Sequence, residues 1–110
     1  MKNKVVTNHY KKERRKRENF INKYIHNDGY IIDGFIVDKG HKNGAEVHSI
    51  TDNGIIIIHN LESGALVTKL IARENQIKRY YKNTNKTPPR EYKRVLELAR
   101  WHESLGYNSV

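Results

Sequence analysis

The chain has 110 residues, contains no cysteine and carries a formal net charge of +9. A chain of this length is expected to form one domain, residues 1–110, and the lack of cysteine excludes disulfides, thiolate metal sites and cysteine nucleophiles. The longest aliphatic run, Ile55 to Ile58, is far shorter than the roughly 20 apolar residues that span a bilayer, and no apolar signal-peptide core follows the basic N-terminal region. We therefore expect a cytoplasmic protein with no membrane contact.

The charge is divided by segment. Residues 1–25 hold nine Lys/Arg and two Glu, residues 26–68 hold two Lys and six Asp/Glu, and residues 69–110 hold ten Lys/Arg and four Glu. The three segments therefore carry local net charges of +7, −4 and +6. Two strongly basic segments around a mildly acidic middle favour a polyanionic partner such as nucleic acid.

A basic N-terminal helix is predicted over residues 1–28. Thr7 or Asn8 can cap this helix, and the sequence Asn27-Asp28-Gly29 is typical of a helix end. Only the second half of the segment has apolar residues at helical spacing, at Phe20, Ile21, Tyr24 and Ile25. We expect that half to pack on the domain and the basic half to project into solvent.

Residues 30–72 have the alternation of an antiparallel sheet. Asp52-Asn53-Gly54 predicts a tight hairpin between the second and third strands, and Glu62-Ser63-Gly64 predicts the next turn. The simplest assembly is a four-stranded meander. Its predicted strands are Tyr30–Val37, Ala45–Thr51, Ile55–Leu61 and Leu66–Ala72.

Two helices are predicted over residues 74–106. The first runs from Glu74 to about Lys82, and the second opens at Pro88 or Pro89 after the cap residue Thr87. The predicted fold class is therefore α+β, with an N-terminal helix, a four-stranded antiparallel meander, and two C-terminal helices packed on one face of the sheet.

The predicted hairpin register places titratable side chains together. If Asn53 and Gly54 are the two central turn residues, His48 lies opposite His59, and Glu46 lies two residues along on the same face. If the loop uses Asp52 and Asn53 instead, Glu46 lies opposite His59. On the fourth strand Thr68 and Lys69 point to opposite faces, so only one of them reaches this cluster.

Two histidines and a carboxylate suit metal-independent cleavage of RNA by its own 2′-hydroxyl. One group takes the hydroxyl proton, another protonates the departing 5′-oxygen, and a cation such as Lys69 or Arg73 holds the phosphate. The alternative interpretation is that His48 and His59 are ordinary strand residues without a chemical role. No metal or cofactor is expected, because the histidines lack helical metal-binding spacing and the aspartates do not form a calcium loop.

The basic residues of the two outer segments are the predicted nucleic-acid contacts. Tyrosines lie among those of the second basic cluster and can stack on unpaired bases, so structured or single-stranded RNA is favoured over uniform duplex DNA. The alternatives are a solvated charged face or an acidic protein partner. The predicted contacts are Lys11, Lys12, Arg14, Arg15, Lys16, Arg17, Arg73, Lys78, Arg79, Tyr80 and Tyr81.

Several stretches resemble small proteins of phages and conjugative elements of Gram-positive bacteria. These stretches are DKGHKNGAEVH (38–48), ITDNGII (50–56), LIAR (70–73), QIKRYY (76–81), ARWH (99–102) and LGYN (105–108). The order of a helix and then a four-stranded antiparallel sheet is also similar to the barnase, EndoU, colicin and RelE group of ribonucleases. The resemblance extends over residues 5 to 108 and implies a bacterial host.

The ribonuclease resemblance implies a catalytic group on the leading helix and others on the sheet. The matching positions are His9, His48, Thr68, Lys69 and Arg73. A second implication comes from mobile-element proteins that resemble anti-CRISPR inhibitors, which act on the guide RNA of a type II effector or block its assembly with that effector. Three hypotheses therefore stand: an RNA-cleaving protein, a non-catalytic inhibitor of guide RNA assembly, and a DNA-binding accessory protein. The oligomeric state is left open.

Overall fold

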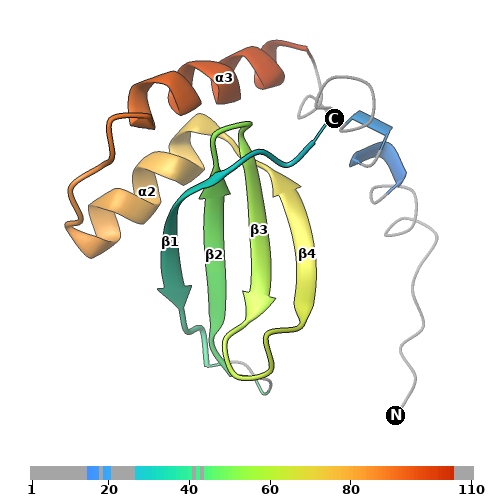
Figure 1. Ribbon diagram of the computed structural model, residues 1–110, viewed down its shortest axis with the longest axis vertical. Helices are drawn as coiled ribbons and strands as arrows, with labels where there is room; N and C mark the ends of the chain where they lie inside the picture. Colours follow the sequence, from blue (N-terminus) through green and yellow to red (C-terminus); the bar gives the residue numbers. More distant parts are fainter. Residues whose placement is uncertain (1–14, 18, 21–26, 41, 43, 106–110) are drawn as a thin grey trace.

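The computed structural model describes residues 15–17, 19–20, 27–40, 42 and 44–105. It contains a four-stranded antiparallel sheet and helices, which confirms the predicted α+β class (Figure 1). The strands are adjacent in space in their chain order, so the predicted meander is also confirmed. The elements are β1 (Ile31–Val37), β2 (Glu46–Thr51), β3 (Ile55–Asn60), β4 (Leu66–Ile71), α2 (Glu74–Thr84) and α3 (Tyr92–Ser104).

The hairpin between β2 and β3 has a three-residue loop, so both predicted registers are wrong. Ile50 pairs with Ile56 and His48 with Ile58, which leaves Asp52, Asn53 and Gly54 in the loop. The Thr51 hydroxyl accepts hydrogen bonds from the amides of Asn53 and Ile55, and Gly54 adopts a φ of 79°. A left-handed glycine is the usual last residue of a three-residue hairpin loop.

Helix α2 starts at its predicted position and ends two residues later than predicted. It follows β4 directly and is closed at its C-terminal end by Asn85, which has the left-handed φ of 53°. Helix α3 begins at Tyr92, later than the predicted Pro88 or Pro89. The Tyr92 amide donates to the Pro89 carbonyl, so the residues after the two prolines form a turn, and α-helical hydrogen bonding begins with the Val95 amide and the Glu91 carbonyl.

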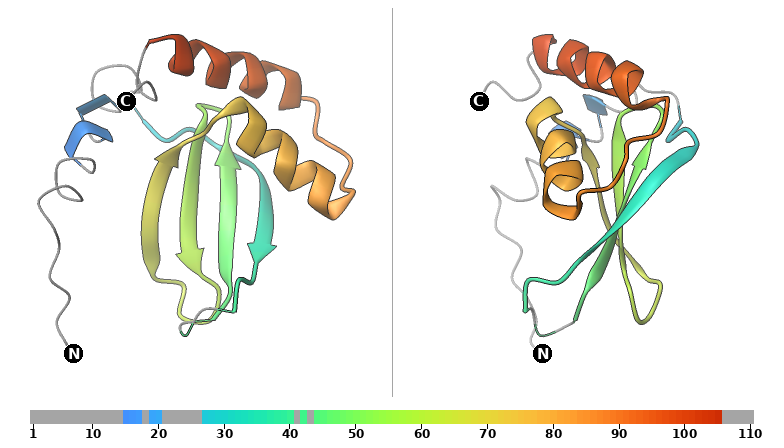
Figure 2. Two further views of the ribbon diagram at one scale, coloured as in Figure 1. Left: turned by 180° about the vertical axis from the view of Figure 1, so that it is seen from behind. Right: turned by 90° about the vertical axis from the view of Figure 1, so that its left-hand side faces the viewer.

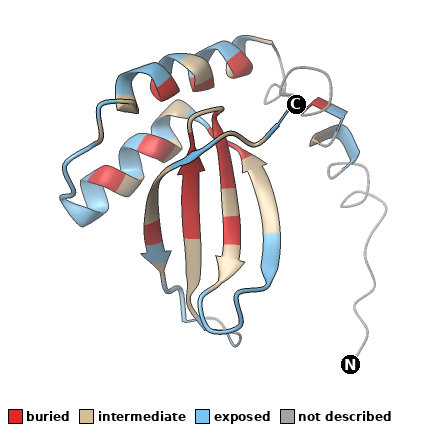
Figure 3. Ribbon diagram, in the orientation of Figure 1, coloured by how far each residue is buried: buried red, intermediate tan, exposed pale blue. Residues whose placement is uncertain are grey.

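The main core lies between the sheet and the two C-terminal helices. Figure 2 shows α2 over one face of the sheet and α3 near the end that carries the β2–β3 hairpin. Buried residues occupy the inward sides of both helices and the hairpin half of the central strands (Figure 3). The core residues are Phe35, Ile50, Ile56, Ile58, Ala72, Ile77, Tyr81, Val95, Leu96 and Ala99.

A second, smaller cluster holds the N-terminal segment against the sheet. Residues 15–17, 19 and 20 are helical, and Phe20 packs with Ile55, Ile71 and Leu105. The rest of the predicted helix over residues 1–28 is outside the described residues, apart from Asn27 and Asp28 in the connection to β1. Neither α2 nor α3 could cross a membrane, since each helix in the described part is too short and too polar.

Candidate active site and nucleic-acid interface

His48 and His59 lie on opposite faces of the sheet, so the predicted pair of histidines does not form. His59 pairs with Val47, and His48 pairs with Ile58. The observed register differs by one residue from each of the two predicted registers. A shift of one residue moves all the side chains of a strand to the other face of the sheet. The sequence could not decide this point, because Asp52-Asn53-Gly54 is compatible with two-residue and three-residue loops.

Glu46 and His48 do come together, on the face of the sheet that α2 covers. Residues two apart on a strand share a face, and Glu46 Oε1 lies 2.9 Å from Nε2 of His48. The other ring nitrogen, Nδ1, lies 2.5 Å from the hydroxyl oxygen of Tyr80 in α2. The His48 side chain is 7 % exposed, whereas that of Glu46 is 27 % exposed. The Glu46 carboxylate is therefore more accessible than the His48 ring.

Tyr80 can act as the hydrogen-bond donor at one end of this chain. Burial raises the pKa of its phenol to about 12, and the nearby Glu46 carboxylate adds to the increase. A phenol that keeps its proton can donate it to Nδ1 of His48, and in the tautomer that accepts this hydrogen bond the ring proton is on Nε2, which faces Glu46. The chain then runs from Tyr80 through His48 to Glu46, and it holds the carboxylate oxygen in place.

A cleft of about 550 Å³ opens between α2 and the half of the sheet farther from the hairpin, and it includes Glu46, His48 and Tyr80. Its apolar lining comes mainly from the strands, at Phe35, Val37, Ile58 and Leu70. Besides Glu46 and His48 of β2, the polar lining comes from α2 and from the end of β1. These polar residues are Asp38, Lys39, Gln76, Arg79, Asn83 and Thr84.

Thr68 and Lys69 lie on different faces, as expected for neighbours on a strand. Thr68 pairs with Ile58 and so shares the face of His48, but two strands away. Its hydroxyl accepts a hydrogen bond of 3.4 Å from Arg17. Lys69 pairs with Ile57 on the opposite face and forms an ion pair of 2.7 Å with Asp28. The predicted proximity of Lys69 to the Glu46 and His48 cluster is therefore wrong.

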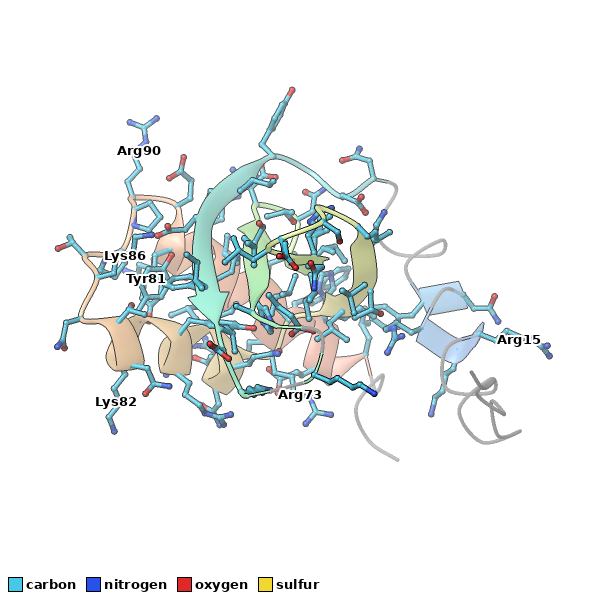
Figure 4. All side chains as sticks on the ribbon, turned by 90° about the horizontal axis from the view of Figure 1, so that it is seen from below. Arg15, Arg73, Tyr81, Lys82, Lys86 and Arg90 are labelled. Atoms are coloured by element: carbon cyan, nitrogen blue, oxygen red, sulfur yellow. The ribbon has the colours of Figure 1, made fainter. Side chains whose placement is uncertain are left out.

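Helix α2 presents cations on its solvent side. The buried residues of α2 are Ile77 and Tyr81, which lie one turn apart on the side of the helix that faces the core. The exposed cations are Lys78, Arg79 and Lys82. Lys78 is within 3.3 Å of Glu74, one turn earlier. Figure 4 shows that Lys82 and Arg73, the residue that precedes α2, project on the same side of the molecule.

Tyr81 is a core residue, which corrects its prediction as a nucleic-acid contact. It is 5 % exposed, and its ring packs edge-on against Phe35. Its hydroxyl donates a 2.9 Å hydrogen bond to Asp33, whose other carboxylate oxygen accepts from Lys86. Burial of Asp33 acts to raise the pKa of its carboxyl, but the hydrogen bonds from Lys86 and Tyr81 lower that pKa overall.

The described cations of the N-terminal segment lie apart from those of α2. Arg15 and Lys16 are exposed, and Arg17 is partly buried. Figure 4 places Arg15 at the opposite end of the molecule from Lys82, with the sheet between them. The two predicted basic regions therefore do not form one continuous surface in the described part. The predicted residues His9, Lys11, Lys12 and Arg14 lie outside the described residues.

The role of Tyr80 as a hydrogen-bond partner of His48 was missed in the sequence. It was predicted to stack on bases, but the separation of 32 residues from His48 gives no local pattern that would reveal the contact.

In the described segments no group of three or more His, Cys, Asp or Glu side chains is placed to hold a metal ion. Comparisons with protein-family models, curated proteins and solved structures found no match.

Proposed function

We propose that this protein binds RNA along the cationic side of α2 and cleaves it in the adjacent cleft by attack of a 2′-hydroxyl on the neighbouring phosphate. The observation that carries this proposal is the Glu46 carboxylate, which is held by His48 and Tyr80 and lines the same cleft as Arg79. A positioned base beside a cation is the minimum that this reaction requires.

In the proposed reaction Glu46 is the general base. Its carboxylate takes the proton of the 2′-hydroxyl as the 2′-oxygen attacks phosphorus, and the bond between phosphorus and the 5′-oxygen breaks. Solvent supplies the proton of the departing 5′-oxygen. Arg79 and Lys39, which line the cleft, stabilise the additional negative charge on the phosphate oxygens. The products are a 2′,3′-cyclic phosphate and a 5′-hydroxyl end.

His48 and Tyr80 are positioning residues in this scheme. Neither needs to touch RNA, because their hydrogen bonds act on the orientation of the Glu46 carboxylate. We also propose that both C-terminal helices contribute to one layer on the cleft side of the sheet. The exposed cations of α3, Lys93 and Arg94, would then extend the surface formed by Lys78, Arg79 and Lys82.

The burial of His48 also favours a second candidate, an RNA-binding protein without turnover. A histidine that is 6 % exposed and engaged at both ring nitrogens also fits a purely structural role. Such a protein would act by occupying its RNA, as in the proposed block of guide RNA assembly with a type II CRISPR effector. Both candidates use the same surface of α2 to bind RNA, so only an assay of RNA cleavage distinguishes them.

The test is incubation of the pure protein with end-labelled structured RNA, with and without a chelator, followed by mapping of the product ends. Cleavage that persists with chelator and leaves 2′,3′-cyclic phosphate ends is the expected result. Intact RNA in a stable complex would support the non-catalytic candidate. A preference for duplex DNA over RNA at the same salt concentration would favour a DNA-binding accessory protein and contradict both candidates.

A further inference from the structure

The cleft beside α2 has a small volume and two kinds of lining. Its volume of about 550 Å³ is in the range of pockets that enclose small molecules, roughly 300–1,000 Å³. The apolar part is formed by Phe35, Ile58 and Leu70. On the α2 side, the Asn83 amide can both donate and accept hydrogen bonds, and the Gln76 amide, whose oxygen accepts from the Arg73 amide, keeps its NH₂ group as a donor. An apolar floor with hydrogen-bonding edges is the chemistry that a nucleobase requires.

We infer that this cleft binds one unpaired nucleotide of RNA, with its base against the apolar floor and its ribose at Glu46. The inference rests on the proposed function and specifies its substrate as RNA with an unpaired nucleotide at the cleaved bond. The phosphates on either side of the bound nucleotide would lie at the mouth of the cleft. Arg79 lines that cleft from α2, and Lys82 lies on the next turn of the helix.

The charges that line the cleft are compatible with one nucleotide. Two acidic side chains, Asp38 and Glu46, are present together with Lys39 and Arg79. Asp38 already accepts a 3.0 Å hydrogen bond from the Gly40 amide, and Glu46 accepts from His48. The exposed Arg79 is on α2 at the cleft, where phosphate can reach it. A base can therefore occupy the apolar part of the cleft while Arg79 is available to its phosphates.

A duplex does not meet the same requirements. In A-form RNA the 2′-hydroxyls line a wide, shallow minor groove, and the bases are paired and stacked. The Glu46 carboxylate is 27 % exposed and lines a cleft between a helix and a sheet, so the ribose of a paired nucleotide would have to leave the groove surface to reach it. The attacking 2′-oxygen must also come into line with the bond from phosphorus to the 5′-oxygen. A flexible, unpaired nucleotide reaches this arrangement more easily than one inside a helix.

The cleft can be obstructed at Asn83, an exposed residue near the end of α2. Asn83→Trp and the control Asn75→Trp, at an exposed α2 position that does not line the cleft, are compared in a Glu46→Gln background, where cleavage does not interfere. Fluorescence anisotropy measures binding of a labelled single-stranded RNA. Stacking of one base contributes enough affinity that we expect Asn83→Trp to weaken binding roughly tenfold, and Asn75→Trp by less than about twofold. Equal affinities of the two variants would overturn the inference.

A second measurement needs no variant in the cleft. The same background protein is titrated with an RNA hairpin that has a single bulged nucleotide and with the matched hairpin without it. We expect at least about fivefold tighter binding of the bulged RNA, from the stacking of the extruded base. Equal binding of both hairpins would contradict an unpaired-nucleotide site. If both measurements succeed and the wild-type protein cleaves no RNA, the cleft assignment stands and the proposed cleavage fails.

Discussion

The Tyr80 hydroxyl lies 2.5 Å from Nδ1 of His48, which joins α2 to the central strand β2. The two rings also meet edge-on, with their centroids 5.6 Å apart, and Tyr80 stacks on Phe35 of β1. This contact helps to hold α2 over the sheet, together with the core residues Ile77 and Tyr81, and it also orients the His48 ring. Tyr80 therefore contributes both to the wall of the cleft and, through His48, to the orientation of Glu46.

Tyr80→Phe is expected to lower the free energy of unfolding by about 1–3 kcal/mol, because it leaves the largely buried Nδ1 of His48 without its partner. Urea unfolding measures this change. Tyr92→Phe is the control, since Tyr92 is a partly buried tyrosine whose ring packs on Tyr81. Equal stability of the two variants would contradict the proposed hydrogen bond. In the wild-type protein, nitrogen NMR of His48 should show the ring proton on Nε2.

The salt dependence of RNA binding tests the cationic side of α2. Each phosphate contact with single-stranded nucleic acid adds about −0.7 to the slope of log affinity against log salt concentration. Lys82→Gln should therefore weaken binding and make this slope about 0.7 less steep. Arg90→Gln removes the same charge from a side chain that points away from Lys82, and it should leave the slope nearly unchanged (Figure 4). Equal effects of the two changes would argue for nonspecific attraction.

Tyr81→Phe tests whether Tyr81 acts only in the core or also contacts RNA. Loss of the hydrogen bond to the partly buried Asp33 should cost about 1–3 kcal/mol of stability, with RNA affinity unchanged once the protein is folded. Tyr30→Phe is a suitable control, because Tyr30 is 82 % exposed. The measurements are urea unfolding and anisotropy titration. A large loss of RNA affinity in folded Tyr81→Phe would reinstate Tyr81 as a nucleic-acid contact.

The burial of His102 leads us to expect a decrease in stability at acidic pH. This residue of α3 is 1 % exposed, and its Nδ1 has no hydrogen-bond partner among the described residues. Its ring meets Phe20 edge-on and lies against Gly54 of the hairpin loop. Burial lowers the pKa of His102 below its ordinary value of 6.5. The unfolded chain therefore binds the proton more readily, and the free energy of unfolding should fall as the pH drops below about 6.5.

Urea unfolding at several pH values between 8 and 5, in wild type and His102→Leu, measures this effect. Leucine removes the titrating ring and keeps an apolar side chain in contact with Phe20. The loss of stability below about pH 6.5 should be smaller in His102→Leu than in the wild type. The same pH dependence in both proteins would assign the effect to other groups.

The sequence predicted the elements of the sheet better than its side-chain partners. Strong alternation and the turn residues Glu62, Ser63 and Gly64 located the strands and the last hairpin. The face of the sheet on which His59 lies, however, depended on whether the hairpin loop has two or three residues. The hydrogen bonds to the Thr51 hydroxyl and the left-handed Gly54 determine the three-residue loop. Glu46 and His48 were correctly placed together, because their separation of two residues fixes a common face in either loop.

Contacts between elements were not predictable from spacing. Tyr80 and Tyr81 are adjacent in the sequence, yet one bonds to His48 at the cleft and the other to Asp33 in the core. A helix rotates by 100° per residue, so only the docking of α2 on the sheet decides which tyrosine lines the cleft. The surroundings of Lys69 were likewise not predictable, because they depend on the register of β4 and on the ion pair with Asp28, which precedes β1.

The most direct test of the proposed chemistry is the single-turnover rate of RNA cleavage by Glu46→Gln, measured with chelator present. A positioned general base contributes about 10²–10⁴-fold, so we expect the rate to fall by at least about 100-fold while RNA affinity changes by less than about threefold. The control Glu62→Gln, at an exposed glutamate in the β3–β4 turn, should cleave at the wild-type rate. Equal rates for Glu46→Gln and Glu62→Gln would contradict the assignment of Glu46 as the base.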